Sequence, residues 1–398
     1  MTDPATPHYL ALADQLGLDR PSIERGETIR ADVTIASLEE FKSIVGAGLT
    51  EEQRDAYEAA LQALPTEPDD DAAALDELKR HVFGRHAPGE KARAYAETVF
   101  PVAAKVMVAK DLVISTDETC GPNGESVIIS CDTLTFDGGS ISAITTRLQI
   151  TARELNIIAG GKAPYHIGIL GEDGEPGRPG ISGAPHDGPA KAGKKAKPFS
   201  PGVCGADGGN GENGKMGNAA GDGENGDHGL PSLEADIYIT EFAANCPNPF
   251  IVFNQSGSGG DGGDGGKGGD GQDGGDGGKG CSSGCTGSNG GDGGDAGRGA
   301  DGRDGGTGGD AAPGNPIMIV FPAQSISMLR TDERAALPGK RGEAGEAGLA
   351  GKPGKKGSGG KHCKSGNNGD ENSDGDPGKP GSPGAGNGAP GQFIIHAH

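Results

Sequence analysis

The stretch that decides the fold reads Gly259-Gly260-Asp261-Gly262-Gly263-Asp264-Gly265-Gly266-Lys267-Gly268-Gly269-Asp270, and its period of three continues to Gly280. The chain then passes through Cys281-Ser282-Ser283-Gly284-Cys285, and the period returns from 284 to 308 with one slip at Ala296. Two similar halves on either side of a tip predict a hairpin. A three-residue period fits the polyproline II helix, which has three residues per turn and no internal hydrogen bonds.

Two other blocks share this design, and strand-like segments separate all three. Glycine recurs at 168–183 and 202–229 in the first block, with a slip at Ala220, and at 339–360 and 366–384 in the third, with a slip at Asn372. The chain therefore predicts six runs in three hairpins, which span 168–230, 257–314 and 338–391.

Glycine content predicts the order of the hairpins. In hairpin two glycine fills two of every three positions, whereas most triplets of hairpins one and three contain one glycine. A three-fold helix has three faces, and a glycine face lets a neighbouring backbone approach closely. Hairpin two should therefore lie in the middle of a six-stranded polyglycine II helix bundle. Collagen is disfavoured because residues 259–312 contain no proline. A flexible glycine-rich linker is the remaining alternative.

This arrangement resembles the glycine-rich antifreeze proteins of springtails and the polyglycine domain of adhesins on the long tail fibres of T-even-like phages. The resemblance covers the glycine blocks only and rests on periodicity and the number of hairpins. It implies an architecture, and no catalytic or binding residue follows from it.

Residues 1–103 differ from the rest of the chain because glycine is rare and apolar residues follow helical spacing. Ser37 to Glu40 and Thr50 to Gln53 each match a capping box. The second is followed by an apolar stripe at Tyr57, Ala60, Leu61 and Leu64, and a further helix should begin at 69–71 and include Leu75, Leu78, Val82 and Phe83. We predict a small α-helical domain that serves either as a docking module or as a cap on the next domain.

Residues 104–167 predict short strands at regular intervals. Their apolar segments are Val106–Val108, Leu112–Ile114, Val127–Ile129, Leu134–Phe136, Ile141–Ile144, Leu148–Ile150 and Leu155–Ile158. Strand-like segments at 233–256, 315–330 and 392–398 lie between or after the glycine blocks and would join this core. The spacing suits a sandwich or a β-solenoid, and we favour a β-solenoid-like all-β core because a stacked coil can add these strands as further rungs. The N-terminal helices would then cover one end of the coil, and residues 392–398 would close the other.

Composition limits the possible functions. The chain has 398 residues, 78 of them glycine, no tryptophan and a formal net charge of −22, which disfavours nucleic-acid binding. No apolar stretch reaches the length of a membrane span, and the start of the chain lacks the pattern of a secretory signal. We expect a cytosolic protein, or one released by lysis or by a specialised machine as part of a particle. The Asp, Lys, Asn and Glu residues of the glycine blocks are interpreted mostly as a solvated face.

No enzyme signature is present, and we expect no catalytic residue and no cofactor. The Gly-x-Gly-x-x-Gly matches fall inside the repeats rather than between a strand and a helix. Cys281, Cys285 and His362 lack the paired spacing of a zinc site, and the Asp-Gly-Gly repeats lack the apolar residue that a folded calcium roll needs. His396 and His398 are interpreted as a surface tail. No metal site is predicted. Cysteines near the tips, including Cys204 and Cys363, leave a tip disulfide and free thiols as alternatives.

The leading hypothesis is a non-enzymatic, adhesin-like interaction protein that displays loop tips on a rigid bundle. Its N-terminal helices would attach it to a larger assembly, and its partner would be a protein or a surface glycan receptor. The expected tips are 185–201, 281–288 and 361–365. Their candidate contact residues are Lys191, Lys194, Lys195, Lys197, Phe199, Cys281, Cys285, Lys361, His362 and Lys364. Two of the tips are basic, which favours an anionic partner. The alternatives are a structural spacer or filament subunit, and an ice-binding protein.

Overall fold

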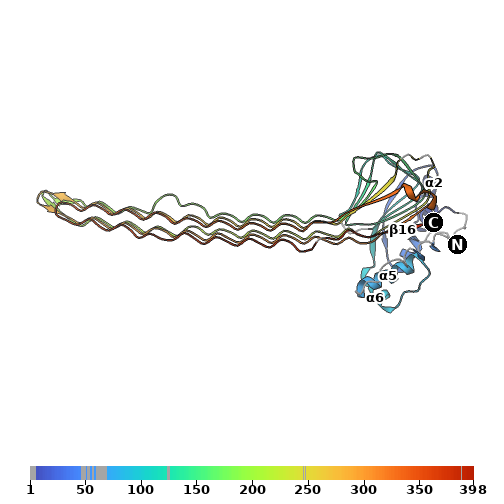
Figure 1. The fold of residues 1–398 in the computed structure, drawn as a ribbon, viewed down its shortest axis with the longest axis horizontal. Coiled ribbons are helices and arrows are strands. Elements are labelled where there is room, and N and C mark those ends of the chain that lie inside the picture. The colour runs from blue at the N-terminus through green and yellow to red at the C-terminus, as the bar shows by residue number, and fades with distance from the viewer. Residues whose placement is uncertain are drawn as a thin grey trace.

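The protein consists of a body and a long rod. The computed structural model describes residues 6–45, 51, 54, 55, 58, 59, 70–122, 126–244, 246, 248–386 and 388–398. The helices, the two large sheets and the C-terminal end of the chain form the body, and the three glycine-rich hairpins extend from it side by side as the rod (Figure 1).

Two sheets form the body. The first has the order β1-β2-β4-β6-β10-β14-β16, and the second has the order β15-β11-β7-β5-β3. Strand pairs within both sheets are parallel except for β1 with β2. The strands of the first sheet are β1 (Ile29–Ile35), β2 (Val102–Ile114), β4 (Ser126–Asp137), β6 (Arg147–Ala159), β10 (Ala235–Phe242), β14 (Ile317–Phe321) and β16 (Phe393–Ala397). Those of the second are β3 (Glu118–Cys120), β5 (Ile141–Ile144), β7 (Ile167–Leu170), β11 (Phe250–Gln255) and β15 (Leu329–Arg334), the last preceded by the 3-10 helix η1 (Ala323–Met328).

From β2 onward the chain alternates between the two sheets. Each hairpin leaves after a strand of the second sheet, which is β7, β11 or β15, and returns to a strand of the first sheet, which is β10, β14 or β16. Apolar side chains from both sheets, among them Phe136, Phe250 and Phe321, share one buried core. Each hairpin therefore connects a strand of the second sheet to the next strand of the first sheet.

Three strands of the first sheet are longer than the sequence analysis predicts. The segments expected as separate strands at 106–108 and 112–114 both lie in β2, and β4 and β6 likewise each join two expected strands. The polar residues that interrupt the apolar pattern pair across the sheet instead of ending the strands. Arg153 donates to both carboxylate oxygens of Asp132 at 2.9 Å and to Glu241 at 2.8 Å. The ladder thus continues through the polar positions.

The N-terminal segment packs on the outer face of the first sheet. Its helices are α1 (His8–Leu16), α2 (Arg20–Glu24), α3 (Leu38–Val45), α5 (Asp70–Phe83) and α6 (Glu90–Val99). Tyr9, Leu12 and Ile23 share a buried cluster with Val106 and Ile128 of β2 and β4. The expectation of a purely helical segment misses β1, which pairs antiparallel with β2 and covers that edge of the sheet. Antiparallel edge pairing depends on a distant strand, so local helical periodicity gives no sign of it.

The observed helices agree with some of the helix starts and caps that the sequence predicts and differ from others. Ser37 caps α3, because its hydroxyl accepts the Glu40 N–H at 3.2 Å, but the Glu40 carboxylate accepts the Ala36 N–H rather than that of Ser37. The helix expected from 69–71 begins at Asp70, with Leu78 and Val82 buried. Thr50 and Gln53, the two ends of the second capping box, and the stripe residues Tyr57, Ala60, Leu61 and Leu64 lie outside the described residues.

Six extended runs build the rod, which we number 1 (171–197), 2 (205–230), 3 (257–280), 4 (288–312), 5 (337–360) and 6 (364–384). Run 3 donates backbone hydrogen bonds to runs 2 and 5, as Gly260 N–H does to Asp227 and Gly259 N–H to Leu337, both at 2.9 Å. Run 4 donates to runs 3 and 6 with the same period of three. Hairpin two, formed by runs 3 and 4, therefore lies between the other two hairpins.

A second ladder, which the sequence analysis does not predict, involves the aspartates. Asp261 Oδ1 accepts the Lys340 N–H at 2.7 Å, while the next residue, Gly262, donates its N–H to the Lys340 carbonyl at 2.8 Å. We call this two-bond unit an Asx-Gly clamp. Further clamps pair Asp264 with Glu343, Asp273 with Lys352, Asp276 with Lys355, Asp292 with Asn367, Asp304 with Lys379, Asn210 with Asp292 and Asn225 with Thr307. Many acidic side chains of the rod are thus hydrogen-bond acceptors for a neighbouring run and not only a solvated face.

Candidate interaction surface at the rod tip

The tip of hairpin one lies further along the chain than its composition suggests. The period-three hydrogen bonds from run 1 to run 3 are interrupted at 185–189, where Figure 1 shows a loop leaving the rod, and they resume after it. Gly183 N–H donates to Lys267, and after the interruption Ala190, Gly193 and Ala196 donate to residues 273, 276 and 279 of run 3. Alanine replaces glycine at two of these positions, so a search for glycine period alone ends the run too early. The turn itself lies between β8 (Pro198–Ser200) and β9 (Val203–Cys204).

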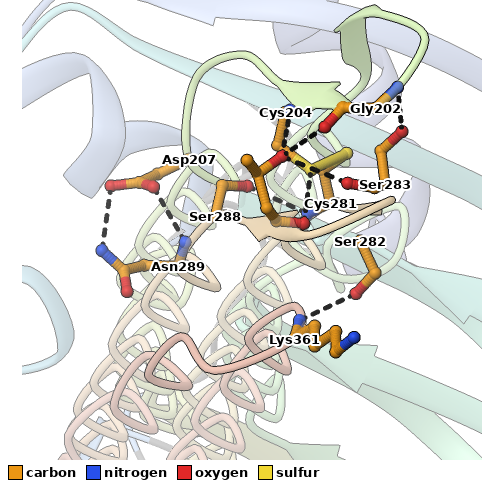
Figure 2. Close-up of a disulfide and its surroundings, with 10 residues drawn as sticks. Gly202, Cys204, Asp207, Cys281, Ser282, Ser283, Ser288, Asn289 and Lys361 are labelled. Atoms are coloured by element: carbon orange, nitrogen blue, oxygen red, sulfur yellow. Dashed lines mark hydrogen bonds between the residues drawn. A yellow bond between two sulfur atoms is a disulfide. The ribbon is translucent and has the colours of Figure 1, made fainter.

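The tip of hairpin two joins that of hairpin one. It consists of β12 (Ser282–Ser283) and β13 (Thr286–Gly287), with Gly284 at φ +58° in the turn. Gly202 N–H donates to Ser283 Oγ at 3.1 Å, and Cys204 N–H donates to Thr286 Oγ1 at 2.9 Å. Cys204 and Cys281 form a disulfide that links the two hairpins, and Figure 2 shows these contacts around it. The tip is therefore cross-linked covalently and by hydrogen bonds.

The third tip joins the same structure. Lys361 N–H donates to Ser282 Oγ at 2.9 Å (Figure 2), and His362 adopts the left-handed conformation at φ +64°. Cys363 N–H donates to the Gly360 carbonyl at 3.0 Å and closes the turn. All three hairpins thus end in one structure, made of residues 198–204, 281–288 and 361–364, which we call the tip platform. Among the described residues Cys285 and Cys363 are free thiols, the first exposed and the second half-buried.

The candidate residues fall into two groups. Phe199, Cys281, Cys285, Lys361, His362 and Lys364 lie at the platform, whereas Lys191, Lys194, Lys195 and Lys197 lie on the last turns of run 1 just before it. Phe199 is 85% exposed and Val203 is 46% exposed. Cys281 is buried in its disulfide and contributes to rigidity rather than to contact. The sequence analysis misses Ser282, Ser283 and Thr286, whose hydroxyls join the tips; small hydroxyl residues in all-polar turns are their only signal.

The charge of this end differs from that of the whole chain. Residues 191–207 contain four lysines, 277–291 one and 355–369 four, while Asp207 is the single acidic residue in these three segments. The net charge of the chain is −22, so the acidic residues concentrate elsewhere. Asp207 is itself engaged, because its carboxylate accepts the Asn289 N–H at 2.8 Å. The tip is a basic surface at the end of an acidic protein.

Within the described part of the chain no group of three or more His, Cys, Asp or Glu side chains is arranged to hold a metal ion, and no helix is both long and apolar enough to cross a membrane. His398, interpreted as part of a surface tail, instead packs on the body. Its ring stacks on Tyr238 with centroids 5.6 Å apart, and its Nε2 lies 3.0 Å from the Ile239 carbonyl oxygen.

Comparison of the chain with protein-family models, with curated proteins and with solved structures found no match.

Proposed function

We propose that this chain is a non-enzymatic interaction protein that presents a basic tip to a partner surface. The single observation behind this proposal is that three hairpins end in one cross-linked platform, joined by the Cys204–Cys281 disulfide and by the Lys361–Ser282 hydrogen bond. Loops held on a rigid scaffold are where proteins concentrate recognition. Lysines around the platform favour an anionic protein or glycan receptor.

In this proposal the rod is a six-stranded polyglycine II bundle and the body is a β-solenoid. The three-residue period of the donor N–H groups supports the first, since a polyproline II helix satisfies its backbone only through neighbours. The alternation of successive strands between two parallel sheets supports the second. The rod would hold the platform away from the body at a defined distance.

The N-terminal helices would attach the body to a larger assembly, at the end opposite the tip. An apolar cleft between these helices and the first sheet supports this role, and its lining includes Leu78, Val82, Tyr95 and Val102. The same helices also cover the first sheet, so attachment would add to a capping role and not replace it.

Tip exchange tests this function. One variant would replace 199–203, 283–286 and 361–364 with neutral Gly/Ser turns of equal length and change Lys191, Lys194, Lys195 and Lys197 to glutamine. A matched control would replace 185–187 in the mid-rod loop. Binding would be compared on panels of immobilised surface proteins and glycans. We expect the tip variant to lose the binding that the unmodified protein and the control share. Equal binding by all three proteins would refute display at the tip and favour a spacer.

A further inference from the structure

Three lysines of run 1 form a straight row beside the platform. The carbonyls of Lys191, Lys194 and Lys197 accept hydrogen bonds from the backbone N–H groups of Glu212, Gly209 and Gly205, at 2.9, 2.9 and 3.4 Å. The three lysines thus occupy the same position in successive triplets, with the same partner run. In a helix with three residues per turn, equivalent positions share one face, and a rise of about 3.1 Å per residue spaces them by about 9 Å.

The row is free to bind an external anion. All three side chains are exposed, and among the described residues none of their ammonium groups forms an ion pair. Some cationic groups further down the rod are paired, as Lys267 is with Asp270 and Arg298 with Asp301. Glycines of run 2 lie opposite Lys194 and Lys197, and only Lys191 has an acidic residue, Glu212, across from it.

An exposed aromatic ring follows the row in the chain. Phe199 follows Lys197 by two residues on β8 and is 85% exposed, at the edge of the tip platform. A phenyl ring offers a large flat apolar face that costs little side-chain entropy to hold in place. This part of the chain therefore combines evenly spaced positive charges with one exposed apolar side chain two residues beyond the last of them.

We propose that Lys191, Lys194, Lys197 and Phe199 bind a linear anionic polysaccharide that lies along the rod. This inference rests on the proposed function and names the ligand class of the same tip. Charges that repeat along one axis match a polymer with a sulfate or carboxylate on successive units, and lysine ammonium groups act as point charges that accept either anion. A flat anionic membrane at the tip would meet only the end of the row, since the row runs parallel to the rod.

The test measures binding of the full chain to heparin, hyaluronan and neutral dextran at several salt concentrations. We expect binding to at least one anionic polymer, none to dextran, and an affinity that falls as salt rises. The variant K191Q/K194Q/K197Q should bind about tenfold more weakly, since exposed charge contacts are individually weak. The control K215Q/K267Q/K379Q, which removes the same charge from the shaft, should stay within about twofold of the unmodified protein.

Three results would overturn the inference: no binding to either anionic polymer at low salt, equal losses in the row variant and the shaft control, or tighter binding to phosphatidylserine vesicles than to the polymers. Circular dichroism and small-angle scattering on each variant check that the rod is intact. If polymer binding fails while the tip-exchange variant still loses its partner on the panels, the polysaccharide assignment falls and the display function stands. If tip exchange changes nothing, the function itself fails.

Discussion

Asp261 Oδ1 accepts the Lys340 N–H at 2.7 Å across runs 3 and 5, and the next residue, Gly262, donates its N–H to the Lys340 carbonyl at 2.8 Å. This pairing explains why aspartate so often precedes glycine in the rod. The glycine supplies the close backbone approach, and the aspartate satisfies an N–H that no backbone carbonyl of the bundle reaches. Removing one clamp should cost about 0.5–1 kcal/mol of the free energy of unfolding.

The clamp can be tested on run 3. The triple variant D264A/D273A/D276A removes three acceptors that bind residues 343, 352 and 355, and we expect a lower urea midpoint and looser packing of hairpin three. The variant D264N/D273N/D276N keeps an acceptor oxygen at each site and should stay closer to the unmodified protein. If alanine and asparagine destabilise the protein equally, charge and not the clamp is responsible.

Prolines remove several backbone N–H donors from the outer edge of hairpin three, the edge that faces away from hairpin two. The Gly259 and Gly290 N–H groups donate to Leu337 and Lys364 and so connect hairpin two to hairpin three. The next residues, Gly260 and Gly291, donate instead to Asp227 of run 2 and Gly278 of run 3. Some of the equivalent positions in hairpin three, those that precede Gly339, Gly354, Gly378, Gly381 and Gly384, are prolines: Pro338, Pro353, Pro377, Pro380 and Pro383. Others, such as Arg341 and Ala344, keep their N–H. Proline has no N–H, so this edge cannot donate to a further hairpin at the proline positions.

This edge should therefore keep rods from associating laterally. We expect P377G/P380G/P383G to associate with rising concentration in sedimentation velocity, while the unmodified protein does not associate through this edge. The control P185G/P189G makes the same chemical change in the mid-rod loop and should behave like the unmodified protein. A variant that sediments like the control across the concentration range would show that the prolines have another role.

Interior glycines of run 3 should not tolerate a side chain. A Cβ on Gly263 would fall well inside 3.0 Å of the Arg178 carbonyl oxygen, whereas one on Gly205 would meet its nearest atom, the Lys197 carbonyl oxygen, at 3.4 Å. We expect G263A to lower the free energy of unfolding by about 1–3 kcal/mol and G205A to change it little. Denaturant titration of both variants measures this. Equal, small effects would mean that the runs do not pack closely.

Acid should destabilise the body. Burial lowers the pKa of His166, whose Nδ1 accepts the Ile251 N–H at 3.0 Å. Burial also lowers the pKa of His8, whose Nε2 lies 3.2 Å from the Thr151 carbonyl oxygen. An unfolded histidine has a pKa of about 6.5, so the unfolded chain binds more protons than the folded one just below that pH. The free energy of unfolding should therefore fall as the pH drops from 7 through the window below 6.5.

Thermal melts at pH 7.5 and 5.0 measure this pH dependence. The variant H8Q should show a smaller loss between the two pH values, while H362Q, which changes an exposed tip histidine, should show the same loss as the unmodified protein. An unmodified protein that is more stable at pH 5.0 than at 7.5 would contradict the assignment.

Glycine spacing predicts six runs and a middle place for hairpin two, because glycine marks the faces where backbones approach. The hydrogen bonds of Gly259 and Gly260 to two different hairpins agree with that prediction. The spacing could not reveal that Ala190 and Ala196 continue run 1, because alanine fits at an outer run where fewer neighbours crowd it. The glycine period alone therefore places Lys191 to Lys197 in a loop rather than on a run.

The pairing of Cys204 with Cys281 could not be predicted either, since it depends on how far two hairpins slide past each other. That register is set by many weak contacts along the rod rather than by any local motif. Strand β1 escapes prediction for a similar reason, because its residues 29–35 pair with β2, far along the chain. The sequence alone favours solvated aspartates, because their acceptor role exists only once two runs lie side by side.

Small-angle X-ray scattering of the full chain, under oxidising and reducing conditions, tests the central claim most directly. The account predicts an elongated particle in which a rod of about 75 Å extends from the body, given run 3 at about 3.1 Å per residue. Reduction should leave that length unchanged, because the hydrogen bonds of the shaft do not depend on the Cys204–Cys281 disulfide. A compact body with flexible tails, whose radius of gyration approaches the scaling of an unfolded chain, would contradict the account.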